Sequence, residues 1–314
     1  MIEVRHVSKR YGDVLAVDSL DFTVRPGIVT GFLGPNGAGK STTMRIIMGL
    51  DRPTTGEALV NGKPMTAQRA PLHEVGALLE AKGVHPGRSA RNHLLAMAAT
   101  TGIGAKRVDE VLEIVGLAQV ANKRAGTFSL GMGQRLGIAV ALLGDPEVVI
   151  LDEPVNGLDP EGVRWIRYLL RDLAAEGRTV FVSSHLMNEM AVTAEHLIIV
   201  GRGKLIADES LAAFTARATH SSVMVRAASP EALRSLLASG AVTAVLDTDG
   251  ALEVTGMSAH DIGEKAFAAG IAVHELTDHR ASLEDAFMEI TGDSVEYHGG
   301  VTAERYAHMN GVAA

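Results

Sequence analysis

The residues from Gly34 to Thr42 have the types and spacing of a phosphate-binding loop. They read Gly34-Pro35-Asn36-Gly37-Ala38-Gly39-Lys40-Ser41-Thr42 and match the pattern G-x-x-x-x-G-K-[ST]. Glycines let the backbone curl so that successive N–H groups face phosphate oxygens, and a helix that starts there adds its partial positive charge. We expect Lys40 to reach the β- and γ-phosphates and the Ser41 hydroxyl to bind Mg²⁺. The alternative is a glycine-rich turn that only connects two elements.

Two acidic residues follow a second apolar segment. Asp152 and Glu153 come directly after Val148–Leu151, which has the composition of a buried strand. The first carboxylate is placed to hold Mg²⁺ through its water shell, and the second to orient or deprotonate the water that attacks the γ-phosphorus. Such a pair alone is often a solvated turn, but beside the phosphate loop it predicts a nucleoside triphosphatase site.

Two further side chains have the chemistry to contact a nucleotide. His185 follows the apolar segment Val180–Val182, where an imidazole can hydrogen-bond the γ-phosphate and sense its loss. A surface histidine at a helix start is the alternative. Tyr11 precedes Gly12 in a polar loop and can stack on an adenine face, although a lone aromatic in a loop is weak evidence by itself.

A second anion-binding helix end is predicted between residues 128 and 135. Ser129 has the type of a helix N-cap, and the N–H groups from Leu130 to Gly133 would be exposed at that end. A cap with no ligand is the alternative. Because one chain rarely needs two phosphate-binding ends far apart in sequence, we infer that this end serves the nucleotide of a neighbouring subunit.

Buried strands must position these residues. Ile28–Leu33 leads into the phosphate loop and a helix over Ser41–Gly49, and Val148–Leu151 and Thr179–Val182 have the same apolar character. Residues from about 86 to 145 carry apolar positions at helical spacing. Strands that alternate with helices predict a largely parallel α/β sheet, with the ligand beyond the carboxyl ends of the strands.

The pattern changes from about Ser221. Strands and helices then follow in the order βαββαβ: Val223–Val225, Pro230–Ala238, Val242–Leu246, Leu252–Val254, Ala259–Ala269 and Ile271–Glu275. This order is typical of a small ferredoxin-like domain. We therefore predict a nucleotide-binding domain over residues 1–215 with a helical subdomain at about 86–145, an accessory α+β domain over 216–292, and a flexible tail over 293–314.

Composition narrows the class of protein. The 314 residues hold 29 Lys and Arg against 37 Asp and Glu, a net charge of −8, and no cysteine. Disulfides, thiolate metal sites and thiol nucleophiles are therefore excluded. The acidic balance argues against nucleic acid as a partner. The sequence has neither a secretory signal nor a run of about 18 apolar residues, so we expect a cytoplasmic chain that reaches a membrane only through a partner.

Five segments together resemble the ATP-binding subunits of ATP-binding cassette (ABC) transporters. In the family's order they are the phosphate loop Gly34–Thr42, the signature Ser129–Met132, the acidic strand Val148–Glu153, the D-loop Asn156–Asp159 and the switch histidine His185. Tyr11 falls where the family has its adenine-stacking aromatic residue. The resemblance covers residues 1 to about 215 and implies a phosphate-loop ABC cassette with an inserted helical subdomain.

Two positions depart from the usual family pattern. The signature commonly reads Leu-Ser-Gly-Gly-Gln, whereas Phe128–Met132 keeps only Ser129 and Gly131 of it. This version is similar to the antibiotic-export branch, which includes bacitracin- and daunorubicin-type exporters. Glu80 stands where the family has a glutamine that contacts Mg²⁺ and the permease, and a carboxylate is a competent oxygen ligand for Mg²⁺.

The resemblance implies a head-to-tail dimer, expected here as a homodimer. Each ATP, with its Mg²⁺, would lie between the phosphate loop of one subunit and Ser129, Gly131 and Asp159 of the other. Hydrolysis would open the dimer and move a separate transmembrane permease, so that the chain sits peripherally on the inner face of the membrane. The implied activity is ATP hydrolysis that drives export of an antibiotic, peptide or other drug-like compound.

Two other classes of protein share the phosphate loop. ABC ATPases that act on ribosomes usually fuse two cassettes, and those that act on chromosomes insert long heptad arms, and the sequence has neither feature. A phosphate-loop kinase would leave Ser129, Gly131 and His185 unexplained. The sequence therefore favours the transporter subunit.

Overall fold

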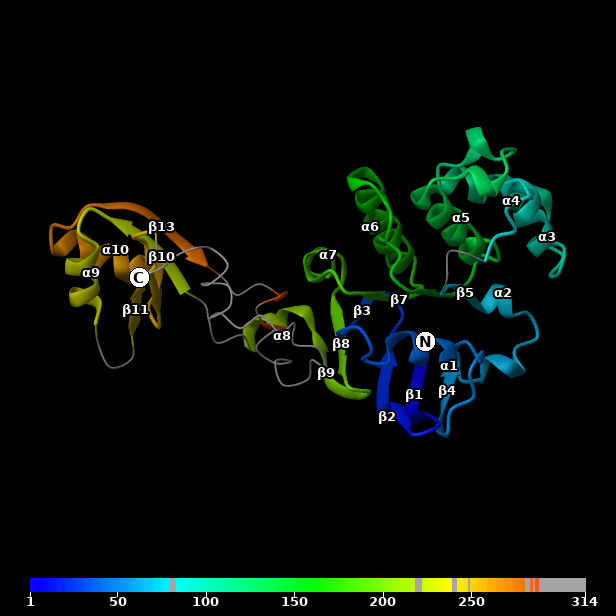
Figure 1. The fold of residues 1–314 in the computed structure, drawn as a ribbon, viewed down its shortest axis with the longest axis horizontal. Helices are drawn as coiled ribbons and strands as arrows, with labels where there is room; N and C mark the ends of the chain where they lie inside the picture. The colour runs from blue at the N-terminus through cyan, green and yellow to red at the C-terminus, as the bar shows by residue number, and fades with distance from the viewer. Residues whose placement is uncertain are drawn as a thin grey trace, which may run out of the picture. The chain divides into compact units, whose positions relative to one another are not determined.

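The computed structural model describes residues 1–79, 83–217, 222–238, 242–247, 249–279, 283–284 and 286–287. Glu80 and the predicted tail over 293–314 lie outside the described residues. Two compact units divide the chain (Figure 1). The first holds Met1–His185 and Ile198–Asp208, and the second holds Leu186–Leu197 and Glu209–Ile290. The domain boundary expected between residues 215 and 216 stays a prediction.

A six-stranded sheet carries the strands that the sequence analysis expected. Its strand order is β5 (Val75–Leu78), β6 (Val148–Leu151), β7 (Thr179–Ser184), β3 (Val29–Leu33), β8 (His196–Gly201) and β9 (Lys204–Ser210). The pairs β5–β6, β6–β7 and β7–β3 are parallel. Every residue of β3, β6 and β7 is buried, which explains their continuous apolar sequences. The residues that follow these strands therefore meet at one edge of the sheet.

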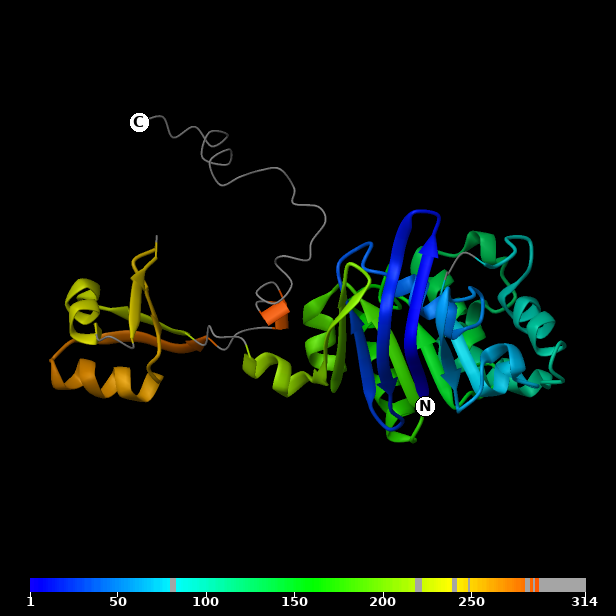
Figure 2. The ribbon, with the colours of Figure 1, turned by 90° about the horizontal axis from the view of Figure 1, so that it is seen from below.

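A second, antiparallel sheet has the order β2 (Val14–Val24), β1 (Ile2–Tyr11) and β4 (Thr55–Val60). The long strands β1 and β2 lie side by side, and both are blue in Figure 2. The alternation of Ile2–Val4 and of Phe22–Val24 predicts only short strands in this region. The pairing of β1 with β2 shifts register at three places, and these irregularities break the two-residue alternation by which a strand is recognised.

Three phenylalanine rings join the two sheets. Phe22 of β2 lies 5.7 Å from Phe32 of β3 and 5.9 Å from Phe181 of β7, and the last two rings are 5.0 Å apart, measured between ring centroids. Buried aromatic pairs at these distances stabilise a core beyond the apolar area they remove from water. This packing fixes β3 and β7, which both end at the phosphate loop's edge of the sheet.

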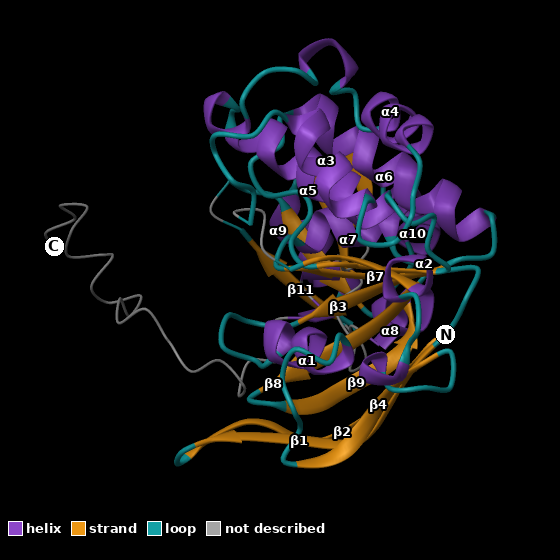
Figure 3. Cartoon of the chain, turned by 90° about the vertical axis from the view of Figure 1, so that its right-hand side faces the viewer, coloured by secondary structure: helices purple, strands orange, loops and turns teal. Residues whose placement is uncertain are grey.

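Helices cover the first unit, and three of them make up the predicted helical subdomain. These three are α3 (Ala90–Ala98), α4 (Ala105–Ile114) and α5 (Leu130–Leu142). They lie together, away from the antiparallel strands β1, β2 and β4 (Figure 3). The other helices of this unit are α1 (Lys40–Ile47), α2 (Pro71–Glu74), α6 (Pro160–Ala175) and the 3₁₀ turns Met65–Ala67, Ala118–Val120 and Ala125–Thr127. Among the described residues, no helix is both long and apolar enough to span a bilayer.

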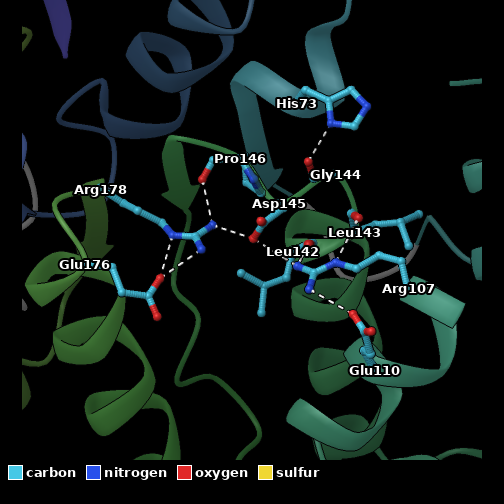
Figure 4. A network of polar contacts seen from close by, with 10 residues as sticks. All are labelled: His73, Arg107, Glu110, Leu142, Leu143, Gly144, Asp145, Pro146, Glu176 and Arg178. Carbon is cyan, nitrogen blue, oxygen red and sulfur yellow. Dashed lines mark hydrogen bonds and ion pairs between the residues drawn. The ribbon is translucent and has the colours of Figure 1, made fainter.

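Polar contacts hold the loop that connects α5 to β6 (Figure 4). Arg107 of α4 donates to the carbonyl oxygen of Leu142 at 2.9 Å and lies 3.2 Å from Asp145. Arg178, just before β7, contacts Asp145 at 2.9 Å and donates to the Pro146 carbonyl at 3.0 Å. Arg107 thus satisfies a carbonyl group left free at the end of a helix. These contacts tie α4 to the loop before β6, the strand that the acidic residues follow.

The second unit contains its own antiparallel sheet, in the order β11 (Thr243–Leu246), β12 (Leu252–Thr255), β10 (Ser222–Ala227) and β13 (Val273–His279). Its helices are α7 (Met187–Thr193), α8 (Leu211–Arg217), α9 (Pro230–Leu237) and α10 (Ala259–Ala268). Leu233 of α9 and Ile262 of α10 pack in one core with Val225 and Leu252. Apolar spacing along the helices therefore positions this unit's core.

Candidate functional site

The phosphate loop and the acidic residues line one hollow of about 250 Å³. The described residues that line it are Ala16, Asn36, Gly37, Ala38, Gly39, Lys40, Ser41, Thr42, Asp152 and Glu153. These residues come from β2, from the loop between β3 and α1, from the start of α1, and from the chain directly after β6. Most of the residues predicted from the sequence to bind phosphate therefore lie together at the carboxyl edge of the parallel strands.

Glycines give the loop its shape. Gly39 has φ of +98°, and a Cβ there would lie 2.6 Å from the Ala16 carbonyl oxygen. Gly34 packs equally closely, because a Cβ there would lie 2.3 Å from the Val200 carbonyl oxygen. Helix α1 begins after Gly39 with no side-chain cap, so its first N–H groups have no partner within the helix. Such an end is suited to bind an anion.

Lys40 is the first residue of α1 and is only 7% exposed. Its ammonium donates to the carbonyl oxygens of Gly34 at 2.6 Å and Pro35 at 3.2 Å. Burial lowers the pKa of Lys40, and the charges of Glu153 and Asp152 act in the opposite direction. A buried cation held in this way favours a ligand that brings negative charge.

The acidic residues are linked to the loop and to His185. Ser41 donates to Asp152 Oδ2 at 2.7 Å, across 111 positions of sequence. Glu153 Oε2 lies 2.7 Å from Nδ1 of His185. Glu153 also has φ of +50°, a conformation that residues other than glycine seldom adopt. The structure thus places His185 beside Glu153, at the edge where the sequence predicted it.

Oxygen donors suitable for Mg²⁺ are present in the hollow. Among the described residues, no three His, Cys, Asp or Glu side chains gather as a metal-binding group. Mg²⁺ needs fewer protein ligands, because it keeps several waters and binds phosphates through one or two protein oxygens. The Ser41 hydroxyl and the Asp152 carboxylate, already in contact, fit that requirement.

Tyr11 lies at the end of β1, close to the loop but outside the set of residues that line the hollow. Its hydroxyl donates to Asp51 at 2.8 Å. The Lys9 ammonium lies 4.8 Å from the ring centroid. Tyr11 is 46% exposed, so part of its ring remains open to a ligand.

Residues Ser129, Gly131 and Asp159 are not among those that line the hollow. Ser129 accepts a hydrogen bond from the Met132 N–H at 3.2 Å and so caps α5. Asp159 accepts one from the Gly162 N–H at 2.8 Å and caps α6. Within one chain the signature segment therefore forms a separate helix end, as the sequence predicted.

Three residues near the acidic pair were missed by sequence analysis. Ala16 lines the hollow, and nothing in the sequence distinguishes it. Gln134 donates to the Glu153 carbonyl oxygen at 3.2 Å, and Ser183 contacts both Asp152 and Glu153. Two signals in the sequence could have identified the last two: Gln134 is a polar residue in an apolar helix, and Ser183 is a hydroxyl residue at the end of an apolar strand.

Gly131→Ala should lower ATP hydrolysis, whereas Gly133→Ala should not. A Cβ on Gly131 would lie 2.8 Å from the Gly157 carbonyl oxygen, which must then shift, while a Cβ on Gly133 meets nothing within 4 Å. We expect Gly131→Ala to destabilise the chain by about 1–3 kcal/mol and Gly133→Ala to stabilise it by up to about 1 kcal/mol. Thermal melts and phosphate release measure the two effects, and equal behaviour of the variants would contradict the contact.

The fold and this hollow define a phosphate-loop nucleoside triphosphatase. A glycine-rich loop joins the buried strand β3 to a helix that begins with a buried lysine, and two carboxylates that follow β6, two strands along the sheet, face this loop. The comparisons with known proteins identify which such enzyme it is.

Residues 17–156 match the family model described as "ABC transporter", and residues 221–284 match a domain of unknown function (DUF8746). The bacitracin transport ATP-binding protein BcrA of Bacillus licheniformis is 44% identical over 209 residues, 66% of this chain and 68% of that protein. An uncharacterised ABC transporter ATP-binding protein, YhcH of Bacillus subtilis (strain 168), is 35% identical over 305 residues, 94% of this chain and 97% of that protein.

A solved structure gives the same assignment. The dimeric, post-hydrolysis ATP-binding cassette MJ0796, bound to ADP and phosphate, is 27% identical and has a TM-score of 0.62, covering 67% of this chain and 99% of that one. The chain belongs to the ATP-binding subunits of ABC transporters. It is an ATPase.

Proposed function

We propose that two copies of this chain hydrolyse ATP with Mg²⁺ at shared sites and drive export of an antibiotic, peptide or other drug-like compound through a separate permease. The observation that carries the proposal is the separation, within one chain, of two helix ends suited to anions. One is the phosphate loop at α1, and the other is the capped start of α5. A head-to-tail pair brings each loop to the other copy's α5.

Each residue in the hollow has a role in this proposal. The amides of the loop and the Lys40 ammonium bind the β- and γ-phosphates, and the Ser41 hydroxyl and Asp152 hold Mg²⁺, which supplies charge neutralisation at those phosphates. Glu153 orients or deprotonates the attacking water, and His185, in contact with it, binds the γ-phosphate. Tyr11 stacks on the adenine through its exposed ring face. Glu80 is proposed as a further Mg²⁺ ligand.

The second copy completes the site. Ser129, Gly131 and Asp159 contact the nucleotide held by the partner's phosphate loop. Leu130, which follows Ser129, is 64% exposed, so the start of α5 is open to a second molecule. The dimeric assembly of MJ0796, a relative that covers 67% of this chain, supports this arrangement.

The export assignment rests on relatives. The relative that shares 44% identity over 209 residues is named for bacitracin transport. We infer that this chain likewise acts with a transmembrane partner, from the cytoplasmic face of the membrane, and that nucleic acid is not a partner. Co-purification with a polytopic membrane chain checks the permease, while co-sedimentation with ribosomes would point to a different ABC class.

We also propose that residues 216–292 form a ferredoxin-like accessory domain. The element order β10–α9–β11–β12–α10–β13 and the strand order β11–β12–β10–β13, with antiparallel pairs, support this assignment. Residues 221–284 within it match a domain of unknown function.

Mixing two inactive variants tests the shared site. Ser129→Ala should impair the site that a chain completes for its partner, and Lys40→Ala should impair the site that the chain itself holds. A mixed dimer then contains one site with both intact residues, so ATP hydrolysis should reappear when the purified variants are combined. Phosphate release from each variant alone is the control. Full activity of Ser129→Ala alone, or no recovery on mixing, would contradict the shared site.

A further inference from the structure

Ser183 of β7 contacts both acidic residues of the ATP site. Its hydroxyl oxygen accepts a hydrogen bond from the Glu153 N–H at 2.9 Å, and its hydroxyl hydrogen is donated to Asp152 Oδ1. Its side chain comes from a different strand than the acidic pair, because Leu151 of β6 lies opposite Val182 of β7 in a parallel register. One hydroxyl therefore joins two neighbouring residues across the sheet.

No solvent reaches this hydroxyl, because Ser183 is 0% exposed. Water therefore has no access to replace its hydrogen bonds if the hydroxyl is removed. The Glu153 N–H and one oxygen of Asp152 would then lose a partner in a buried environment, where an unpaired polar group is costly.

Both oxygens of Asp152 are held from opposite sides. Ser41, on the phosphate loop, donates to Oδ2 at 2.7 Å, and Ser183 donates to Oδ1. A carboxylate fixed by two donors has one orientation toward the Ser41 hydroxyl. This matters because Ser41 and Asp152 are the pair that we propose as Mg²⁺ ligands.

The peptide of Glu153 is fixed in the same way. Its N–H donates to Ser183, and its carbonyl oxygen accepts from Gln134 of α5 at 3.2 Å. Hydrogen bonds on both sides hold the residue at its φ of +50°, which is unfavourable for a side chain with a Cβ. The direction of the Glu153 carboxylate depends on this backbone conformation.

We propose that Ser183 is a positioning residue for ATP hydrolysis: its hydroxyl fixes Asp152 for the metal and Glu153 for the attacking water in one arrangement. The inference rests on the proposed roles of Asp152 and Glu153. Ser183 acts through these two side chains and does not line the hollow that holds the nucleotide. Removing a residue that hydrogen-bonds and orients a metal ligand typically changes metal affinity or activity by about 10- to 100-fold.

Ser183→Thr and Ser183→Val form a matched pair that isolates the hydroxyl. The two side chains have nearly the same volume and branch at Cβ, so any disturbance of the buried strand should be shared, while only threonine keeps the hydroxyl. We expect Ser183→Val to have a kcat about 10-fold below that of Ser183→Thr and to need several-fold more Mg²⁺ for half-maximal hydrolysis. The affinity for ATP without Mg²⁺ should differ by less than about twofold between the two variants, because the side chain at position 183 does not contact the loop amides.

Ser184→Ala is the control on the same strand. Ser184 is equally buried but faces the opposite side of the sheet. We expect Ser184→Ala to need the same Mg²⁺ concentration as the wild type for half-maximal hydrolysis. Thermal melts of all variants record any loss of folding. Equal kcat and equal Mg²⁺ dependence in the threonine and valine variants would overturn the inference.

This outcome is distinguishable from failure of the proposed function. If the proposed function is wrong, the wild type fails to hydrolyse ATP or Glu153→Gln turns over normally. If only the role of Ser183 is wrong, the wild type is active and Glu153→Gln is stalled, yet the hydroxyl at position 183 makes no difference.

Discussion

Glu153→Gln is expected to bind ATP with nearly unchanged affinity and to release phosphate at least about 100-fold more slowly. Glutamine keeps the shape of the side chain and its carbonyl oxygen, so the contacts of the loop with the triphosphate remain. The amide cannot take a proton from water, which removes the proposed general base, the carboxylate that lies 2.7 Å from His185. Phosphate release and equilibrium binding of ATP measure the two quantities separately.

The same variant tests the shared site. If hydrolysis is what separates two chains joined by ATP, Glu153→Gln with ATP should elute as a stable dimer in size-exclusion chromatography, while the wild type returns to monomer. Glu113→Gln, an exposed change on α4 with the same loss of charge, is the matched control and should behave as the wild type. Unchanged phosphate release from Glu153→Gln would remove Glu153 from its assigned role.

The parts of the site built from contiguous residues were predictable from the sequence. The loop Gly34–Thr42 carries in one stretch the glycines for its curve, the cation and the hydroxyl, and the structure places the loop between β3 and α1 as expected. The N-cap at Ser129 was also local, because the Ser129 hydroxyl and the Met132 N–H that donates to it are three residues apart. A short pattern suffices where the interacting groups are neighbours in the chain.

Contacts between strands were not predictable in the same way. The bond from Ser183 to Asp152 exists because β6 and β7 are adjacent and in one register, and a single sequence carries no direct record of that register. The same reasoning applies to Ala16, which reaches the hollow only because β2 crosses near Gly39. Local patterns therefore identified the charged and hydroxyl groups that line the hollow, and missed contacts that depend on the pairing of strands.

The long strands β1 and β2 show a different limit. Their alternation is interrupted by register shifts, and His6 and Ser19 have φ near +50°, so apolar positions do not recur every second residue. The sequence predicted the start of β1 and the end of β2, and did not predict the rest of either strand. The full length of an irregular strand cannot be predicted from the sequence when the prediction depends on a strict two-residue alternation.

Lys40→Ala is expected to weaken ATP binding by about 10- to 100-fold, since a hydrogen bond to a charged group contributes about 1.5–3 kcal/mol. The alanine variant lacks the buried ammonium that compensates the triphosphate charge, and the loop loses the contacts to Gly34 and Pro35 that it has without ligand. Thermal melts with and without ATP separate these effects. Loss of the loop contacts changes the melting temperature measured without ATP, and loss of affinity reduces the upward shift that ATP causes.

Lys106→Ala is the matched control, because the Lys106 side chain on α4 is 92% exposed and is not among those that line the hollow. Its ATP-induced shift should equal that of the wild type. A Lys40→Ala chain that keeps the full shift would mean that the backbone amides of the loop and the start of α1 bind the triphosphate alone. The burial of Lys40, which lowers the pKa of its ammonium, would then destabilise the fold without increasing the affinity for ATP. The presence of a buried cation beside the phosphate loop would need another explanation.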